Sequence, residues 1–178
     1  MARPFAVNRE ELSLIESTLE FANLKSIKST DQVENIFKRN EALVGSVFKV
    51  IPATDRSAFE NDQRELRAWL KGITEPPTAN REVIGRKIAE RLKTVDTEIT
   101  FDDGKLHQRF ALSGVQACYS YAIAVVLDKR LGLTNKLAQC GWSECGRFRL
   151  DASPRGRPRK YCNSDHKWRA EGEIRKRV

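Results

Sequence analysis

Apolar residues recur at intervals of three and four along the first half of the chain, with charged and polar residues between them. This spacing places the apolar side chains on one face of an α-helix. The second and third stretches of the pattern run into Pro52 and the Pro76–Pro77 pair, and proline cannot continue a helix. The pattern therefore predicts four helices, over approximately 8–22, 30–51, 55–71 and 80–92.

Between residues 94 and 111 the pattern changes to an alternation of apolar and polar residues. Alternation is typical of a half-buried strand, and the Asp103–Gly104 pair is typical of a tight turn between two strands. We therefore expect a β-hairpin over 97–111. The next segment, Val115–Leu133, is apolar on almost every side, which indicates a central helix that is buried all round.

These elements predict a mainly α (α+β) fold in two parts. Residues 1–135 are expected to form a helical N-terminal domain with one β-hairpin, and residues 136–178 a small basic unit that ends in a helix. A chain of 178 residues is long enough to bury a substantial core, so the first part needs neither metal nor disulfides. The residues with distinctive chemistry lie in the second part.

Three of the four cysteines and one of the two histidines fall within 27 residues of one another in this second part. The pattern is Cys140-x4-Cys145, then sixteen residues, then Cys162-x3-His166. Zinc is bound tetrahedrally by thiolate and imidazole ligands, and two close pairs bring four of them together at little entropic cost. We expect these four residues to bind one structural Zn²⁺. The alternative is that they are unrelated buried cysteines and a surface histidine.

The residues around the two pairs predict the shape of the metal-binding unit. Phe148–Leu150 and Arg159–Tyr161 look like two short strands. Cys162 and His166 fit the first turn of a helix, where positions i and i+4 share a face. Knuckle, hairpin and ligand-bearing helix together describe a treble-clef-like zinc finger, whose closed site is structural rather than catalytic. The fourth cysteine, Cys118, lies in an apolar segment and is expected to be an inert core residue.

The chain carries a net charge of +8, and this excess is confined to its last 50 residues. Residues 129–178 contain 14 Lys/Arg and 5 Asp/Glu, a net charge of +9, whereas residues 1–128 contain 18 and 19, a net charge of −1. Basic charge concentrated around a small metal-folded unit favours a polyanionic partner, above all nucleic acid. The alternative is a solvated face, which is the usual role of a run of charges.

The basic side chains that we expect to contact nucleic acid lie on both sides of Cys162. They are Arg155, Arg157, Arg159, Lys160, Lys167, Arg169, Arg175, Lys176 and Arg177. Together they can neutralise several phosphates, and a basic helix braced by zinc can enter the major groove of DNA. DNA is the favoured polymer and RNA the alternative. We expect Trp168 to pack against the small core of the finger and Trp142 to pack against the N-terminal domain.

Other classes of protein are disfavoured by what the sequence lacks. It has no run of about 18 apolar residues, and residues 1–8 lack the apolar stretch of a signal peptide, so we expect a cytoplasmic protein with no membrane partner. It has no P-loop, G-x-S-x-G or H-E-x-x-H motif, so we expect no enzymatic activity. Three functions remain: a DNA-binding regulator, a zinc-stabilised module that docks an acidic protein, and an RNA-binding or ribosome-associated accessory factor.

The sequence around the first cysteine pair resembles the first half of the CGNR zinc finger, which reads C-x4-C-G-x-x-F-x-D-x-S. Here residues 140–153 read Cys-Gly-Trp-Ser-Glu-Cys-Gly-Arg-Phe-Arg-Leu-Asp-Ala-Ser. Arg159–Cys162 resembles that finger's R-R-W-C, and Arg175–Arg177 matches its basic helix. The chain departs in the second pair: His166 replaces the last cysteine, Lys-Trp replaces Gly-Asn, and the spacer is one residue shorter. The spacing is equally similar to treble-clef fingers ending in Y-C-S-x-x-C or Y-C-S-x-x-H.

The N-terminal part is similar to the ABATE domain, a mostly helical domain that precedes the CGNR finger. The stretch Leu19-Glu20-Phe21-Ala22-Asn23 is similar to its L-D-F-x-N, and a hairpin and an apolar helix likewise come before the first ligand. The resemblance implies a bacterial, stress-related regulator of transcription that binds nucleic acid. In such a regulator we expect the N-terminal domain to sense a signal or to form a homodimer.

Overall fold

The computed structural model describes residues 7, 9–44, 56–75, 79–102, 105–111, 114–151 and 159–176. The helices are α1 (Arg9–Asn23), α2 (Thr30–Val44), α3 (Arg56–Thr74), α4 (Ala79–Leu92), α5 (Gly114–Leu127) and α6 (Ser164–Lys176). The strands are β1 (Asp96–Asp102), β2 (Lys105–Ala111), β3 (Leu137–Gln139) and β4 (Phe148–Leu150). The mainly α (α+β) fold predicted from the sequence is therefore confirmed.

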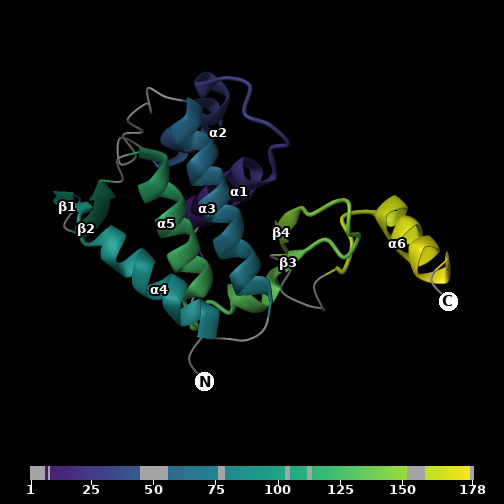
Figure 1. Cartoon of the computed structure of the whole chain (residues 1–178). Coiled ribbons are helices and arrows are strands. Elements are labelled where there is room, and N and C mark those ends of the chain that lie inside the picture. The colour runs from purple at the N-terminus through teal and green to yellow at the C-terminus, as the bar shows by residue number, and fades with distance from the viewer. Residues whose placement is uncertain are drawn as a thin grey trace.

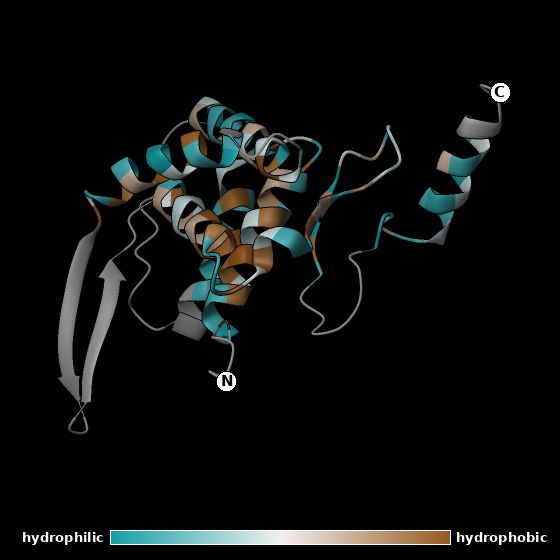
Figure 2. Cartoon of the chain, turned by 90° about the horizontal axis from the view of Figure 1, so that it is seen from below, coloured by the Kyte–Doolittle hydropathy of each residue, from teal (hydrophilic) through white to brown (hydrophobic). Residues whose placement is uncertain are grey.

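The core of the helical body surrounds α5, the most apolar of the described helices. Helices α1, α3 and α4 all pack against it (Figure 1). Tyr119 and Ile123 of α5 are fully buried, as are Phe21 of α1 and Leu70 of α3. Figure 2 shows that hydrophobic residues gather inside this bundle, whereas α6 is largely hydrophilic. The sequence prediction of a buried central helix is therefore confirmed.

Helix α5 ends at Leu127 and is therefore shorter than the predicted segment Val115–Leu133. The backbone N–H of Arg130 donates to the Asp128 carboxylate at 2.9 Å, a local turn that competes with the helix. Gly132 then adopts a left-handed conformation with φ of 65°, which other residues rarely adopt. The apolar residues beyond Asp128 therefore pack onto the core from turns and a 3₁₀ helix.

Two other helices differ in detail from the prediction. Helix α3 continues to Thr74, three residues beyond the predicted end at residue 71. Val83 of α4 has an apolar side chain but is 50% exposed, whereas Ile84 and Ile88 are buried. The inner face of α4 is therefore centred on these two isoleucines. Several predicted features lie outside the described residues, namely Pro52, the Pro76–Pro77 pair, the Asp103–Gly104 turn, Arg155, Arg157 and Arg177.

The predicted β-hairpin over 97–111 is present as the antiparallel pair β1 and β2. Its register runs from Asp96 opposite Ala111 to Asp102 opposite Lys105. Alternation of apolar and polar residues thus identified both strands, and the short connection between them indicated that they are antiparallel.

The second strand pair differs from the prediction. Phe148–Leu150 forms strand β4 as expected, but its antiparallel partner is β3, and Arg159–Tyr161 is not a strand. The physical reason is burial. Leu137 of β3 and Phe148 of β4 join the hydrophobic core of the helical body, where the two strands contact α3 and α1. The strand pair that carries the first two metal ligands is thus attached to the bundle.

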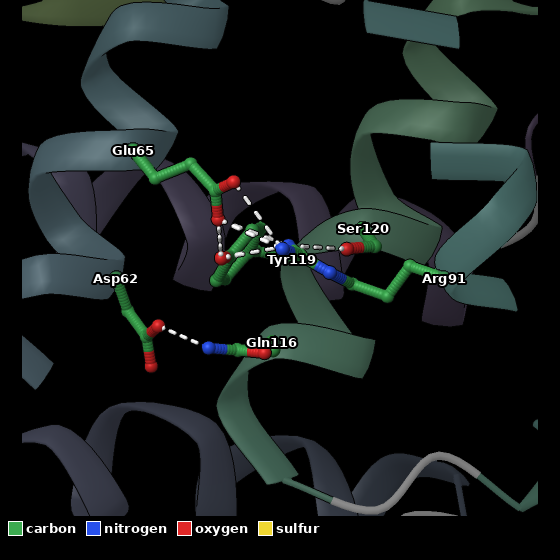
Figure 3. A network of polar contacts seen from close by, with 6 residues as sticks. All are labelled: Asp62, Glu65, Arg91, Gln116, Tyr119 and Ser120. Carbon is green, nitrogen blue, oxygen red and sulfur yellow. Dashed lines mark hydrogen bonds and ion pairs between the residues drawn. The ribbon is translucent and has the colours of Figure 1, made fainter. Parts of the chain in front are cut away.

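A polar network joins α3, α4 and α5 at the edge of the core (Figure 3). The guanidinium of Arg91 donates to both carboxylate oxygens of Glu65 at 3.0 and 3.2 Å, and the Tyr119 hydroxyl donates to the same carboxylate at 2.6 Å. One turn before Glu65, the Asp62 carboxylate accepts a hydrogen bond from Gln116 at 2.6 Å. Charged and hydroxyl groups thus cross-link three helices that otherwise meet through apolar side chains.

Candidate metal centre

The first pair of predicted ligands lies at the tip of the β3–β4 hairpin. The backbone N–H of Cys140 donates to the carbonyl of Arg147 at 2.8 Å and extends the strand ladder by one residue. Beyond it the chain turns tightly, and the N–H of Cys145 donates to the carbonyl of Trp142 at 3.0 Å. Gly146 has a φ of 59°, a left-handed conformation that suits glycine. This backbone forms the knuckle that the spacing of the two cysteines predicted.

The second pair lies at the start of α6. His166 is the third residue of the helix, whereas Cys162 lies two residues before it begins, so the prediction that both ligands lie in the first helical turn is wrong for Cys162. The Asn163 side chain caps the helix by accepting a hydrogen bond from the backbone N–H of His166 at 2.9 Å. The N–H of Gly141 donates to the carbonyl of Lys160 at 2.8 Å, which ties this segment to the knuckle. A side chain at position 141 would come within 3.1 Å of Lys160, so the close approach favours glycine.

The four predicted ligand atoms form one cluster. The thiols of Cys140, Cys145 and Cys162 and a ring nitrogen of His166 all lie within 4.8 Å of one another. The two sulfurs of Cys145 and Cys162 are 3.7 Å apart, and Cys140 Sγ is 3.6 Å from His166 Nδ1. A tetrahedral zinc, with Zn–S of about 2.3 Å and Zn–N of about 2.0 Å, would separate two sulfurs by about 3.8 Å and a sulfur and a nitrogen by about 3.5 Å. The donors and their spacing therefore fit one structural zinc ion, as predicted.

The thiols of this cluster differ in their affinity for protons. Burial alone would raise the pKa of Cys140, but backbone hydrogen bonds from Trp142 and Cys162 outweigh it and lower the pKa to about 6. Burial raises the pKa of Cys162 to about 12, and the neighbouring thiols of Cys140 and Cys145 contribute to the increase. Without a metal ion, the protein therefore favours the thiolate form of Cys140 and disfavours that of Cys162. Zinc binds thiolates, so a bound divalent cation would supply the charge needed to keep the three thiols deprotonated.

Side chains of the knuckle and of α6 hold His166 from the side. The Trp142 ring lies against the His166 ring with the centroids 4.7 Å apart, and its Nε1–H donates to Glu173 at 2.8 Å. The Ser143 hydroxyl donates to the same carboxylate at 3.2 Å, and the Arg169 guanidinium lies 5.1 Å from the Trp142 ring centre. The described contacts of Trp142 are therefore with α6, and not with the helical body as expected from the sequence.

The side chain of Asn23, at the end of α1, joins the finger to the helical body. Its Nδ2 donates to the carbonyl of Phe148 at 2.7 Å, and its Oδ1 accepts from the N–H of the same residue at 2.9 Å. A side-chain amide with one donor and one acceptor thus pairs with β4 as a neighbouring strand would. The two residues are 125 positions apart in the sequence, so no local pattern indicates this contact.

The structure brings together only some of the basic residues predicted to contact nucleic acid. Arg159, Lys160 and Lys167 line a groove of about 290 Å³ beside the start of α6. Arg169 is exposed, but its guanidinium lies over the Trp142 ring and it does not line this groove. The side chains outside the described part of the chain are those of Arg155, Arg157, Arg175, Lys176 and Arg177.

Trp168 lies on the outer side of α6 and is 64% exposed. The expectation that it packs against the core of the finger is therefore wrong. The reason is the helical repeat: His166 and Ala170, four residues apart, form the inward face, and the residue midway between them points to the opposite side. The Nζ atom of Lys167 lies 5.9 Å from the centre of the Trp168 ring.

Comparison with models of protein families finds no family that matches the chain, and comparison with curated proteins finds no matching protein. The fold and the cluster of four residues describe the chain instead: it is mainly helical and carries, after its helical bundle, a group of three cysteines and one histidine that fits one structural zinc ion. Among the described helices, none is both long enough and apolar enough to cross a membrane.

Proposed function

We propose that this chain is a zinc-finger protein that binds nucleic acid, with DNA as the favoured polymer and regulation of transcription as its role. One observation supports this most directly: three cations, Arg159, Lys160 and Lys167, line one groove beside α6. Among the described residues that line this groove there is no carboxylate. A concave surface with charge of a single sign concentrates its field, so it attracts phosphate more strongly than scattered cations do.

The two glutamates of α6 do not prevent this role. Glu173 accepts hydrogen bonds from Trp142 and Ser143, so its charge is directed toward the knuckle. Glu171 lies 4.0 Å from Lys167 Nζ in a solvent-accessible pair. Pairs of this kind contribute about 0–1 kcal/mol, so a phosphate can replace the glutamate as the partner of Lys167.

The zinc site supports the shape of this surface. Cys162 lies between the basic residues Arg159 and Lys160 and the start of α6, so a metal ion bound to Cys162 and His166 would fix that segment against the helix. All four ligands come from the chain, which leaves no coordination position for a substrate. We therefore propose that the protein binds its partner and does not catalyse a reaction.

The resemblance to the CGNR finger and the ABATE domain supports the regulatory part of the proposal. In that setting the finger contacts DNA in the bacterial cytoplasm, and the helical body senses a signal or forms a homodimer. The basic groove supports the proposal that the protein binds nucleic acid. The choice of DNA and of a regulatory role rests on the resemblance.

Fluorescence anisotropy with labelled DNA and RNA, titrated at several salt concentrations, tests the proposal. We expect the affinity to fall steeply with salt, because each phosphate contact releases condensed counterions. Arg159→Gln combined with Lys167→Gln should weaken binding and reduce the log–log salt slope by about 2. Arg64→Gln is the matched control, since Arg64 is exposed on α3 and does not line the groove. It should leave both quantities unchanged.

Zinc content is measured in every variant so that a loss of binding is not a loss of the finger. Absence of binding to either polymer at low salt, with zinc in place, would contradict the proposal. It would favour the module that docks an acidic protein. A clear preference for RNA would favour the RNA-binding accessory factor over the regulator.

A further inference from the structure

Trp168 differs from the other two tryptophans of the chain in having its ring open to solvent. Trp69 is buried in the helical core, and the ring of Trp142, in the knuckle, is stacked against His166 and Arg169 of α6. Trp168 is 64% exposed, and the described contact of its ring is with Lys167. An indole in water retains the hydrophobic free energy that burial would release. A ligand with a flat apolar face could use that free energy.

The position of Trp168 relative to the basic groove indicates what such a ligand is. Ser164 lines the groove, and Trp168 lies four residues further along α6, so the two share a face about 6 Å apart along the helix axis. Lys167 belongs to both features, since it lines the groove and lies over the indole ring. A stacking surface and a phosphate-attracting groove therefore stand side by side.

We propose that this surface binds single-stranded nucleic acid, with one base stacked on Trp168 and the backbone in the groove lined by Arg159, Lys160 and Lys167. This inference rests on the proposed function and specifies the form of the nucleic acid. In a duplex the bases stack on one another and present only their edges in the grooves. An unpaired base exposes its whole face, and stacking on an aromatic side chain tolerates any sequence.

Two features of this chain bear on the inference. Lys-Trp stands where the CGNR motif has Gly-Asn, so the stacking surface is not a feature of that motif. Glu171 lies three residues beyond Trp168, on the same side of α6, and 4.0 Å from Lys167 Nζ. It competes with phosphate for that cation, so Glu171→Gln should tighten the binding of single strands.

Anisotropy titrations of the full chain with oligo-dT, oligo-rU and a DNA duplex of the same length test the inference. We expect the single strands to bind more tightly than the duplex. Trp168→Ala should weaken single-strand binding on the order of tenfold, the size of one lost base stack. Trp168→Phe should lose much less, because a stacking ring remains. The oligo-dT and oligo-rU arms distinguish DNA from RNA as the source of the unpaired strand.

Trp168→Lys separates stacking from charge. It removes the indole and adds a positive charge, so a purely electrostatic surface would bind at least as tightly as the wild type. We expect it to bind single strands more weakly than the wild type. Because Trp168 is exposed, zinc content and circular dichroism should be the same in all three variants.

Two results would overturn the inference. If the duplex binds as tightly as the single strands and Trp168→Ala changes neither affinity, stacking plays no part, although the proposed function stands. If none of the three polymers binds, both the inference and the proposed function are wrong.

Discussion

At the scale of single residues, Cys162 is the most informative ligand, because it joins the basic segment to α6. Cys162→Ser removes one of four donors, so zinc should fall from about one per chain to well below that, as measured by elemental analysis. Cys118→Ala is the matched control, since its thiol is 1% exposed in α5 and outside the cluster. It should retain zinc. Full retention by Cys162→Ser would contradict the assigned ligand set.

Asn23 provides a second test at this scale. Asn23→Asp replaces the donor that serves the Phe148 carbonyl with a negatively charged acceptor. A buried carbonyl left without its partner typically costs about 1–3 kcal/mol, so we expect the free energy of unfolding to fall by that order. Urea denaturation followed by circular dichroism measures it. Asn135→Asp, at an exposed position, is the control, and an equal loss in both would show that the amide pair contributes little.

The metal ligands could be predicted from the sequence, whereas the residues that support them could not. The two pairs are local, so their spacing alone indicates that four donors can meet. Trp142 could be assigned a packing role but not a partner, because Glu173 lies 31 residues away. Asn23 belongs to the stretch that is similar to L-D-F-x-N, but that similarity names no partner, and an asparagine at the end of a helix has many possible roles.

At the scale of elements, the network between α3, α4 and α5 makes stability depend on pH. Burial alone would raise the pKa of Glu65, but hydrogen bonds from Arg91 and Tyr119 outweigh it and hold the pKa below its usual 4.5. The ionised carboxylate therefore stabilises the fold above pH 4.5, and this contribution is lost as the pH falls through the lower, folded-state pKa. Glu65→Gln should lower the free energy of unfolding at neutral pH, and its difference from the wild type should shrink in acid.

Asp62→Asn is the matched control, because it should act with the opposite sign. Burial raises the pKa of Asp62 above its usual 3.8, and the hydrogen bond from Gln116 offsets this only in part. Ionised Asp62 is therefore less favourable in the folded than in the unfolded chain. Asp62→Asn should stabilise the protein at neutral pH, with a gain that disappears below pH 3.8. Denaturant titrations at several pH values measure both variants, and equal signs would contradict this account.

The elements themselves were largely predictable, whereas their ends and partners were not. Helical periodicity and strand alternation are local properties of the sequence, so the helices and the β1–β2 hairpin could be expected. The end of α5 depends on a turn at Asp128 that an apolar pattern conceals. The partner of β4 depends on which strand can bury a side chain in the helical core, and Leu137 does so. That choice is made by tertiary packing.

At the scale of the whole molecule, the finger is held in two different ways. Leu137, Phe148 and Asn23 anchor β3 and β4 to the helical body. Helix α6 extends away from that body (Figure 1), and its described side-chain hydrogen bonds to other segments end on the knuckle. Removal of zinc with a chelator should therefore increase amide hydrogen exchange across 159–176 and change β3, β4 and the bundle little. An equal increase throughout, seen by mass spectrometry, would show that zinc stabilises the whole chain.

The attachment of β3 and β4 to the bundle limits how the finger can be used in protein engineering. A fragment cut at residue 136 would carry its metal ligands but would expose Leu137 and Phe148, each of which releases roughly 1.5–3 kcal/mol when buried. It would also leave β4 with an open edge that invites aggregation. The finger is therefore not an independent unit that can be transferred without its contacts to the helical body. A chimera that contains the finger needs a host protein with an apolar surface that buries Leu137 and Phe148. It also needs a side-chain amide in the place of Asn23.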